Sequence, residues 1–219
     1  MVELKKSQDK NNEEDELEFI KEENKKSNFS KFLSFMGELI KTVLISLAII
    51  LPIRYFIIQP FYVKGASMEP NFYDKDYLII NEFVYRLNGP ERGDIVVFKN
   101  PRNTEEFFIK RVIGLPHDKI KIYNNRVYLY NEENPDGAEL KEYYLPNGRE
   151  TRGNEIIELQ EGEYYVLGDN RDRSLDSRVF GPIKKDSIVG KVWFRGWPLD
   201  NMTVFKGVEY NLNESGIKN

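Results

Sequence analysis

The stretch Phe107-Phe108-Ile109-Lys110-Arg111-Val112-Ile113 has the composition of a β-strand and carries a lysine in its apolar centre. Aromatic and β-branched residues suit a pleated, half-buried surface. Side chains alternate between the two faces of a strand, so Phe108, Lys110 and Val112 share one face. This pattern predicts a strand that surrounds the Lys110 amine with apolar atoms.

Similar strand patterns occur on both sides of this stretch. They are found at residues 76–81, 93–99, 120–123, 126–130, 162–168 and 190–195. Asn124-Asn125 separates two of them and is a two-residue hairpin signal. No helical period lies between the strands. The expected fold is therefore mostly β, with antiparallel sheets that form an open-barrel-like domain.

One long apolar segment precedes the strands. Residues 39–58 are apolar except for a few positions, and the charges of Lys41 and Arg54 stand near the segment's ends. About 20 apolar residues span a bilayer. A cleavable signal sequence and a buried helix of a soluble protein are the alternatives. The long preceding region and the apolar character on all sides favour one transmembrane helix at residues 37–60.

The predicted organisation has four parts. Residues 1–36 are rich in Glu, Lys and Asn and are expected to be a disordered tail, because they lack apolar surface to bury. After the anchor, residues 61–205 form the β domain, with a small cap and hairpin subregion at 119–163. Residues 206–219 form a C-terminal tail. Lysines just before the anchor predict a cytoplasmic N-terminus and an extracytoplasmic β domain, in a single-pass plasma-membrane protein.

Composition excludes several kinds of site. The net charge of −4 argues against a nucleic-acid partner. The chain has no cysteine, which excludes disulfides, zinc–thiolate sites and thiol nucleophiles. Its single histidine, His117, lies in a turn, where a histidine is usually only solvated.

A candidate nucleophile follows the anchor in the stretch Val63-Lys64-Gly65-Ala66-Ser67-Met68-Glu69-Pro70. A serine hydroxyl needs a base, and a lysine serves only when neutral. The reference pKa of lysine, about 10.4, falls on burial. Lys110 has an apolar surround, whereas Lys64 and Lys75 lie in polar contexts. On spacing alone, Lys110 could also be an ordinary lysine of an edge strand.

Four segments, in this order, resemble the conserved boxes of bacterial type I signal peptidases, the membrane-anchored enzymes that remove signal peptides. The segments are 67–70 (Ser-Met-Glu-Pro), 92–98 (Arg-Gly-Asp-Ile-Val-Val-Phe), 110–116 (Lys-Arg-Val-Ile-Gly-Leu-Pro) and 168–178 (Gly-Asp-Asn-Arg-Asp-Arg-Ser-Leu-Asp-Ser-Arg). The resemblance extends from the anchor to Pro198. It implies a serine endopeptidase that uses no metal and no cofactor.

The resemblance also implies roles for individual residues. Ser67 would be the nucleophile and Lys110 the general base. Ser174 would hydrogen-bond the lysine amine and orient it. Asp176 and Arg178 would form a supporting salt bridge.

Two shallow apolar pockets are implied for the small side chains of a small-x-small cleavage site. The matching positions are Met68, Phe72 and Phe108 for one pocket, and Phe61, Val63 and Ile109 for the other. Each of these is open to the alternative of an ordinary core residue. The peptide would bind as an added strand along residues 61–63 and 107–109. Three aromatic residues, Trp193, Phe194 and Trp197, would lie either in the lipid interface or in the core.

The sequence departs from the family pattern at four positions. Gly65 stands where some members have a serine that donates to the oxyanion, which leaves the Ser67 backbone N–H as the main expected donor. Asn71, His117 and Arg173 replace the usual threonine, glycine and asparagine. His117 would matter if the glycine adopts a positive φ, although histidine tolerates that conformation better than most residues.

The predicted function is that of signal peptidase I, acting on preprotein signal peptides at the lipid bilayer. Two alternatives were weighed. A self-cleaving, repressor-like domain would use the same pair of residues, but the anchor and the lack of a DNA-binding segment disfavour it. A non-catalytic, membrane-tethered β domain that binds peptides is disfavoured by the presence of both Ser67 and Lys110.

Overall fold

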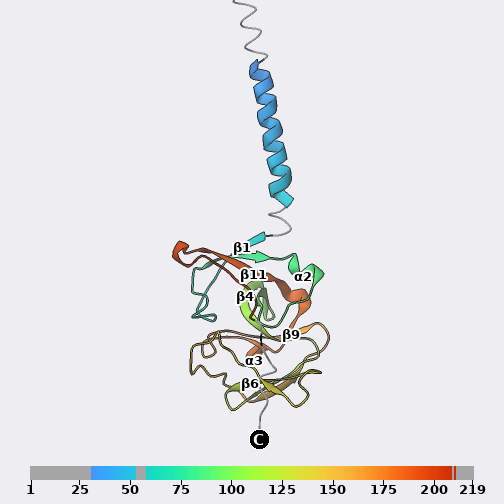
Figure 1. Ribbon diagram of the computed structural model, residues 1–219, viewed down its shortest axis with the longest axis vertical. Coiled ribbons are helices and arrows are strands. Elements are labelled where there is room, and N and C mark those ends of the chain that lie inside the picture. Colours follow the sequence, from blue (N-terminus) through green and yellow to red (C-terminus); the bar gives the residue numbers. More distant parts are fainter. Residues whose placement is uncertain (1–30, 53–57, 209, 211–219) are drawn as a thin grey trace, which may run out of the picture. The chain divides into compact units, whose positions relative to one another are not determined.

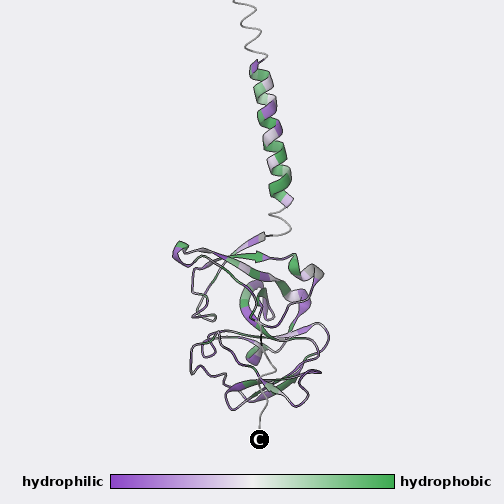
Figure 2. Ribbon diagram, viewed as in Figure 1, coloured by the Kyte–Doolittle hydropathy of each residue, from purple (hydrophilic) through white to green (hydrophobic). Residues whose placement is uncertain are grey.

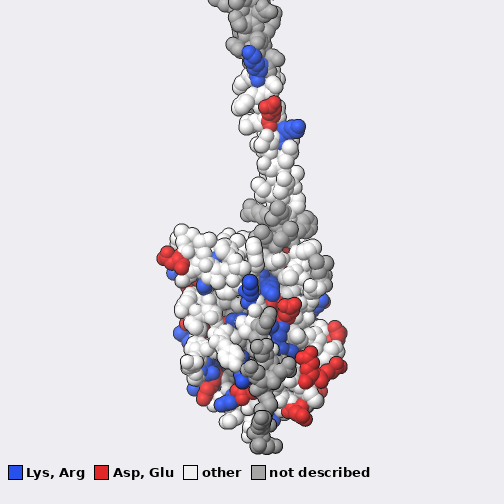
Figure 3. Space-filling model, in the orientation of Figure 1, with Lys and Arg blue, Asp and Glu red and all other residues white. Residues whose placement is uncertain are grey.

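The computed structural model describes residues 31–52, 58–208 and 210. Contacts divide the chain into two compact units, residues 1–53 and 54–219, which are described separately. The first unit contains one helix, Lys31–Pro52, that is long and apolar enough to cross a membrane. Figure 2 shows hydrophobic residues along most of this helix. Its only charged residues, Lys31, Glu38 and Lys41, lie in its N-terminal half, as Figure 3 also shows.

The helix differs at both ends from the predicted anchor. It already includes residues 31–36 of the expected tail, because Phe32, Leu33 and Phe35 extend its apolar character. Its described part extends to Pro52. Residues 58–60, assigned to the anchor from sequence, belong instead to a strand. The rest of the predicted tail, residues 1–30, lies outside the described residues.

The second unit contains two antiparallel sheets (Figure 1). The larger has the strand order β1-β2-β11-β3-β4-β9-β10, and β12 pairs with β11. Its strands are β1 (Ile58–Tyr62), β2 (Tyr77–Asn81), β3 (Ile95–Asn100), β4 (Asn103–Gly114), β9 (Glu163–Leu167), β10 (Ile183–Lys184), β11 (Ile188–Trp197) and β12 (Thr203–Val204). The sheet does not close on itself, so the predicted fold class, open antiparallel β-sheet, is confirmed.

The smaller sheet has the order β7-β6-β5-β8. Its strands are β5 (Lys119–Tyr123), β6 (Arg126–Tyr130), β7 (Ala138–Glu139) and β8 (Glu155–Glu158). The predicted hairpin joins β5 and β6, and Asn124 and Asn125 have φ values of +50° and +62° as its turn requires. Ala138 and Leu140, which follow this hairpin in the chain, are buried against it.

Short helical turns connect the strands. They are α2 (Val84–Leu87), α3 (Ser177–Phe180), η1 (Lys185–Ser187) and η2 (Leu199–Asn201). One hydrophobic core joins the two sheets, with Ile113, Tyr165 and Leu167 of the larger sheet packed against apolar residues of β5 and β6. Full burial of one such side chain stabilises the fold by about 1.5–3 kcal/mol. A second core, built around Met68, Phe72 and Ile80, lies between β1, β2, β3 and β11.

The C-terminal segment is not a free tail over its described part. The Phe205 ring lies 4.5 Å from the Phe72 ring, and Tyr210 packs against the first core. Residues 206–208 run so close to Gly93 that a Cβ there would lie 2.9 Å from the Val208 nitrogen. The sequence did not reveal this packing, because single apolar residues two or three positions apart match neither a strand nor a helix period.

Candidate active site

Ser67 lies in a turn that is held from three directions. The part of the turn that follows Ser67 is anchored in the second core, where the side chains of Met68 and Phe72 are 1% and 0% exposed. Before it, Gly65 adopts a φ of +86° and its N–H donates to Asp74 Oδ1 at 2.8 Å. Beside it, Asn170 donates from its backbone N–H to the Ser67 carbonyl at 2.9 Å. The turn therefore presents Ser67 from a fixed backbone.

Lys110 contacts the Ser67 hydroxyl directly. Its Nζ lies 2.7 Å from Ser67 Oγ and donates to the Ile109 carbonyl at 2.8 Å. The residue is 3% exposed, and the Phe108 ring centroid lies 5.4 Å from Nζ, on the strand face that the alternation predicted. Burial lowers the pKa of Lys110 to about 8, while the charges of Asp176 and Asp169 partly oppose that change. A large share of this amine is thus neutral at mildly alkaline pH.

The strand that carries Lys110 has different neighbours along its two halves. β4 pairs with β3 from Asn103 to Arg111, but with β9 only from Arg111 to Gly114. β1 lies at the end of the sheet order and pairs only with β2. Within the described chain, the outer edges of β1 and of residues 105–109 are therefore free of strand partners. Lys110 itself pairs with Val96 of β3, and β9 begins to pair with β4 only at the next residue, Arg111. In this sense the alternative of a lysine near a strand edge also describes its backbone.

The loop after β9 supports the Ser67 turn at close range. A Cβ on Gly168 would lie 2.5 Å from the Ser67 carbonyl oxygen and would also collide with Ser174. Gly168 therefore lets the loop approach the serine. It was part of a sequence box but was not singled out, because a glycine's neighbours are visible only in three dimensions.

Asp176 and Arg178 form the salt bridge that the resemblance implied, with Arg178 Nη2 2.8 Å from Asp176 Oδ2. Asp176 also caps α3, accepts from the Gly168 N–H at 3.1 Å and is fully buried. The predicted hydrogen bond from Ser174 to Lys110 is not formed. Within the described chain, the buried Ser174 hydroxyl has no hydrogen-bond partner.

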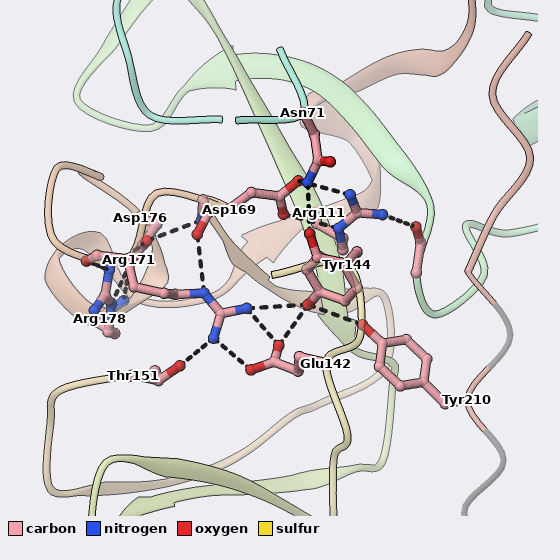
Figure 4. A network of polar contacts seen from close by, with 12 residues as sticks. Asn71, Arg111, Glu142, Tyr144, Thr151, Asp169, Arg171, Asp176, Arg178 and Tyr210 are labelled. Atoms are coloured by element: carbon pink, nitrogen blue, oxygen red, sulfur yellow. Dashed lines mark hydrogen bonds and ion pairs between the residues drawn. The ribbon is translucent and has the colours of Figure 1, made fainter. Parts of the chain in front are cut away.

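A network of buried polar groups, drawn in Figure 4, joins the Ser67 turn, β4 and this loop. Arg111 donates to Asp169 through Nε at 2.9 Å and through Nη2 at 2.7 Å. Asn71 completes the link, since its Nδ2 donates to Asp169 Oδ2 at 2.8 Å and to the Tyr144 carbonyl at 3.1 Å. Hydrogen bonds to Asp169 raise the pKa of Arg111 even though its burial opposes this.

The network extends away from the serine through a second arginine. Arg171 forms an ion pair with Glu142 and also donates to Tyr144 Oη. Tyr210 from the C-terminal segment donates to the same tyrosine oxygen at 3.1 Å (Figure 4). Sequence reasoning missed Arg111 and Asn71 as structural partners of Asp169. The one available signal was Arg111 itself, a charged residue on the β4 face opposite Lys110, because a charge in an apolar strand needs a partner of opposite charge.

A groove of about 740 Å³ opens onto Ser67 and Lys110. Its walls are residues 60–67 on one side and residues 105–110 on the other, with Arg173 and Leu175 from the loop. Among the predicted pocket residues, Phe61, Val63, Phe108 and Ile109 line it. Met68 and Phe72 do not, because they point into the core beneath the turn.

The other singled-out residues lie away from this groove. His117 has a φ of +69°, the conformation expected where the family has glycine, and its exposed Nε2 lies 2.8 Å from Glu161 Oε2. Trp193 and Trp197 are 47% and 55% exposed, so neither is a core residue. Within the described residues, no group of three or more His, Asp or Glu side chains is placed to hold a metal ion.

Comparison with known proteins gives a consistent set of relatives. Residues 36–197 match the family model described as signal peptidase, peptidase S26. A signal peptidase IB from Staphylococcus aureus is 36% identical over 197 residues, covering 83% of this chain and 97% of the relative. A probable signal peptidase I-2 from Synechocystis is 36% identical over 170 residues, covering 74% of this chain and 73% of the relative. A crystal structure of a signal peptidase I from Enterococcus faecalis is 32% identical, with a TM-score of 0.40, and covers 47% of this chain and 96% of that one.

Proposed function

Because this chain belongs to the signal peptidase family, peptidase S26, we propose that it is a signal peptidase I. In this proposal it is a membrane-anchored serine endopeptidase that cleaves N-terminal signal peptides from exported preproteins after small-x-small sites. The observation that carries the proposal is the 2.7 Å contact between Lys110 Nζ and Ser67 Oγ. It joins a hydroxyl to an amine whose lowered pKa makes it available as a base.

In the proposed reaction, Ser67 Oγ attacks the carbonyl carbon of the cleaved bond. Neutral Lys110 accepts the hydroxyl proton as the new C–O bond forms. One N–H of the amine donates to the Ile109 carbonyl, which helps to aim the nitrogen lone pair at Oγ. The resulting ammonium then gives its proton to the leaving amine nitrogen, and the peptide bond breaks. The buried carboxylates Asp176 and Asp169 favour the transient positive charge on Lys110.

Deacylation follows by the same proton path. Water attacks the acyl-enzyme ester, Lys110 takes a proton from that water, and the proton returns to Ser67 Oγ as the signal peptide leaves. The backbone N–H of Ser67 is the proposed oxyanion donor. This N–H donates no hydrogen bond to any described residue, so it is available to the developing negative charge.

Ser174 is proposed to orient the lysine amine during these steps. Its hydroxyl is buried and without a partner in the described chain, and a buried hydroxyl gains free energy from any donor or acceptor brought into reach. The Asp176–Arg178 pair holds this loop in place, because Asp176 accepts from the Gly168 N–H and Arg178 donates to the Arg171 carbonyl.

The groove supports the proposed substrate. An extended peptide entering between residues 60–64 and 105–109 would pair with two strand edges that have no partner in the described chain. Phe61 and Val63 on one wall, and Phe108 and Ile109 on the other, would contact its small side chains. Val63 belongs to the second core, and Phe61 and Ile109 pack against it, so these parts of the walls are fixed. Large side chains before the cleaved bond would therefore be excluded.

The apolar helix, together with the family, supports a membrane-anchored protein. We place its N-terminal side in the cytoplasm, since Lys31 and Lys41 lie toward that end. The β unit would then act outside the cytoplasm. The exposed Trp193 and Trp197 side chains are suited to the lipid interface.

The test uses the purified full chain in detergent micelles with one preprotein. The intact enzyme should release a mature protein whose N-terminus, read by mass spectrometry, follows a small-x-small site. Ser67→Ala and Lys110→Ala should each abolish this product and keep the circular dichroism of the intact chain. Release of the same product by Ser67→Ala would refute the assignment.

A further inference from the structure

Charged side chains line the groove at positions that the proposed reaction does not use. Phe107 of β4 contacts Phe61 with 5.3 Å between ring centroids, and three residues further along β4, Lys110 contacts Ser67. The acidic residues Glu105 and Glu106 line the groove before Phe107. The groove therefore runs from two carboxylates, through an apolar section, to the nucleophile.

The cationic end of the groove comes from the loop after β9. Asn170 donates to the Ser67 carbonyl, and Arg173 donates its backbone N–H to the Asn170 carbonyl at 3.0 Å. Arg173 and Leu175 line the same groove. The Arg173 side chain is exposed, and its guanidinium makes no ion pair with any described residue. Arg173 thus adds a positive charge to the groove that contains Ser67. Its backbone follows, by one hydrogen bond, the Asn170 that contacts Ser67, whereas Glu105 lies five residues along β4 from Lys110.

The apolar section sets the direction of the peptide. Under the proposed function, the residues before the cleaved bond are small and uncharged, so they occupy the section between Phe61 and Ser67. Under the same function, the residues after the cleaved bond continue past Ser67 and away from that section, and the loop of Arg173 contacts the Ser67 turn through Asn170. These residues are the first ones of the mature protein.

We propose that Arg173 is a specificity-determining residue that favours an acidic side chain among the first residues after the cleaved bond. The proposal rests on the proposed function. Arg173 stands where the family pattern has asparagine, which has no charge, so the preference would be a property of this chain. Glu105 and Glu106 act in the same sense, because they disfavour acidic residues at the upstream end of the groove.

The expected size of the preference follows from the exposure of the side chain. Ion pairs between solvent-exposed partners change an equilibrium by about two- to fivefold. We expect a preference of this size for an acidic over a neutral residue in kcat/KM. It should shrink at high salt, since exposed charges are screened.

The experiment uses two preproteins that differ only at the second residue after the cleavage site, Asp in one and Gln in the other. The ratio of their kcat/KM values is measured for the intact chain, Arg173→Asn and Arg173→Glu. We expect a ratio of about two to five, about one, and below one, respectively. Lys64→Gln is the matched control, because it removes one positive charge from the apolar side of the same groove. It should leave the ratio above one.

A ratio of one in the intact chain, or an equal loss in Lys64→Gln and Arg173→Asn, would overturn the assignment to Arg173. Failure of the intact chain to cleave either preprotein would instead refute the proposed function. Binding of the same two sequences to Ser67→Ala, as fluorescent peptides followed by anisotropy, then decides the inference separately. Tighter binding of the Asp peptide, lost in the double variant with Arg173→Asn, supports it, and equal affinity overturns it.

Discussion

Replacing Lys110 by methionine should abolish cleavage and at the same time stabilise the fold near neutral pH. The buried amine has a pKa of about 8, against 10.5 for an ordinary lysine. One unit of pKa difference corresponds to about 1.36 kcal/mol. Below pH 8 the charged amine therefore lowers the unfolding free energy by about 3 kcal/mol. Methionine fills a similar volume without a charge. The hydrogen bonds lost to Ser67 and Ile109 offset about 1 kcal/mol each.

The pH dependence of this effect gives the sharper test. Because the folded pKa of Lys110 is lowered, the unfolded chain binds more protons than the folded chain between pH 8 and 10.5. The stability of the intact chain should therefore rise across that window, whereas Lys110→Met lacks this contribution. Between pH 7 and pH 10, the difference in unfolding free energy between the two proteins should move by about 2.5 kcal/mol in favour of the intact chain.

The assay is urea unfolding of the full chain in detergent micelles, at pH 7 and pH 10. The chain has two tryptophans, Trp193 and Trp197, and both lie in β11, so their fluorescence reports on the β unit. Lys99→Met is the control, because Lys99 is an exposed lysine on the neighbouring strand β3. A difference between Lys110→Met and the intact chain that stays constant with pH, or that is matched by the difference for Lys99→Met, would refute the reasoning.

Three further outcomes are expected from the site. The kcat/KM for preprotein cleavage should rise with pH through about 8 as Lys110 loses its proton, and a profile without an inflection between pH 7 and pH 9 would contradict a lysine base. Gly168→Ala should reduce kcat at least tenfold, because its Cβ would lie 2.5 Å from the Ser67 carbonyl oxygen, while Gly196→Ala meets atoms no closer than 3.4 Å and should change kcat less than twofold. Ser174→Ala should reduce kcat by about 10- to 100-fold, less than the loss in Ser67→Ala, since an orienting hydroxyl takes no part in bond formation; equal losses would place Ser174 in the chemistry itself.

The strands with strong local patterns were predictable one by one. β2, β3, β4, β5, β6, β9 and β11 were each indicated by apolar or alternating runs, and Asn124-Asn125 gave the hairpin between β5 and β6. Among the missed strands, β7, β10 and β12 have two residues each, too few to show a period, and β8 has four. Residues 58–60 of β1 were assigned to the anchor because they continue the largely apolar composition of the preceding segment.

The sequence by itself determined the fold class and a helix apolar and long enough to cross a membrane, because both depend on residue types and local spacing. The resemblance to the signal peptidase family singled out Ser67 and Lys110 as the candidate pair. Only the tertiary structure decided the contact between them, since 43 positions separate the two residues and their approach depends on the register of β4 and the packing of the Ser67 turn. It also decided that Met68 and Phe72 lie in the core, that Asn71 binds Asp169 and that Tyr210 packs against the domain. These are long-range contacts, whose formation depends on where distant segments meet rather than on the pattern within any one of them.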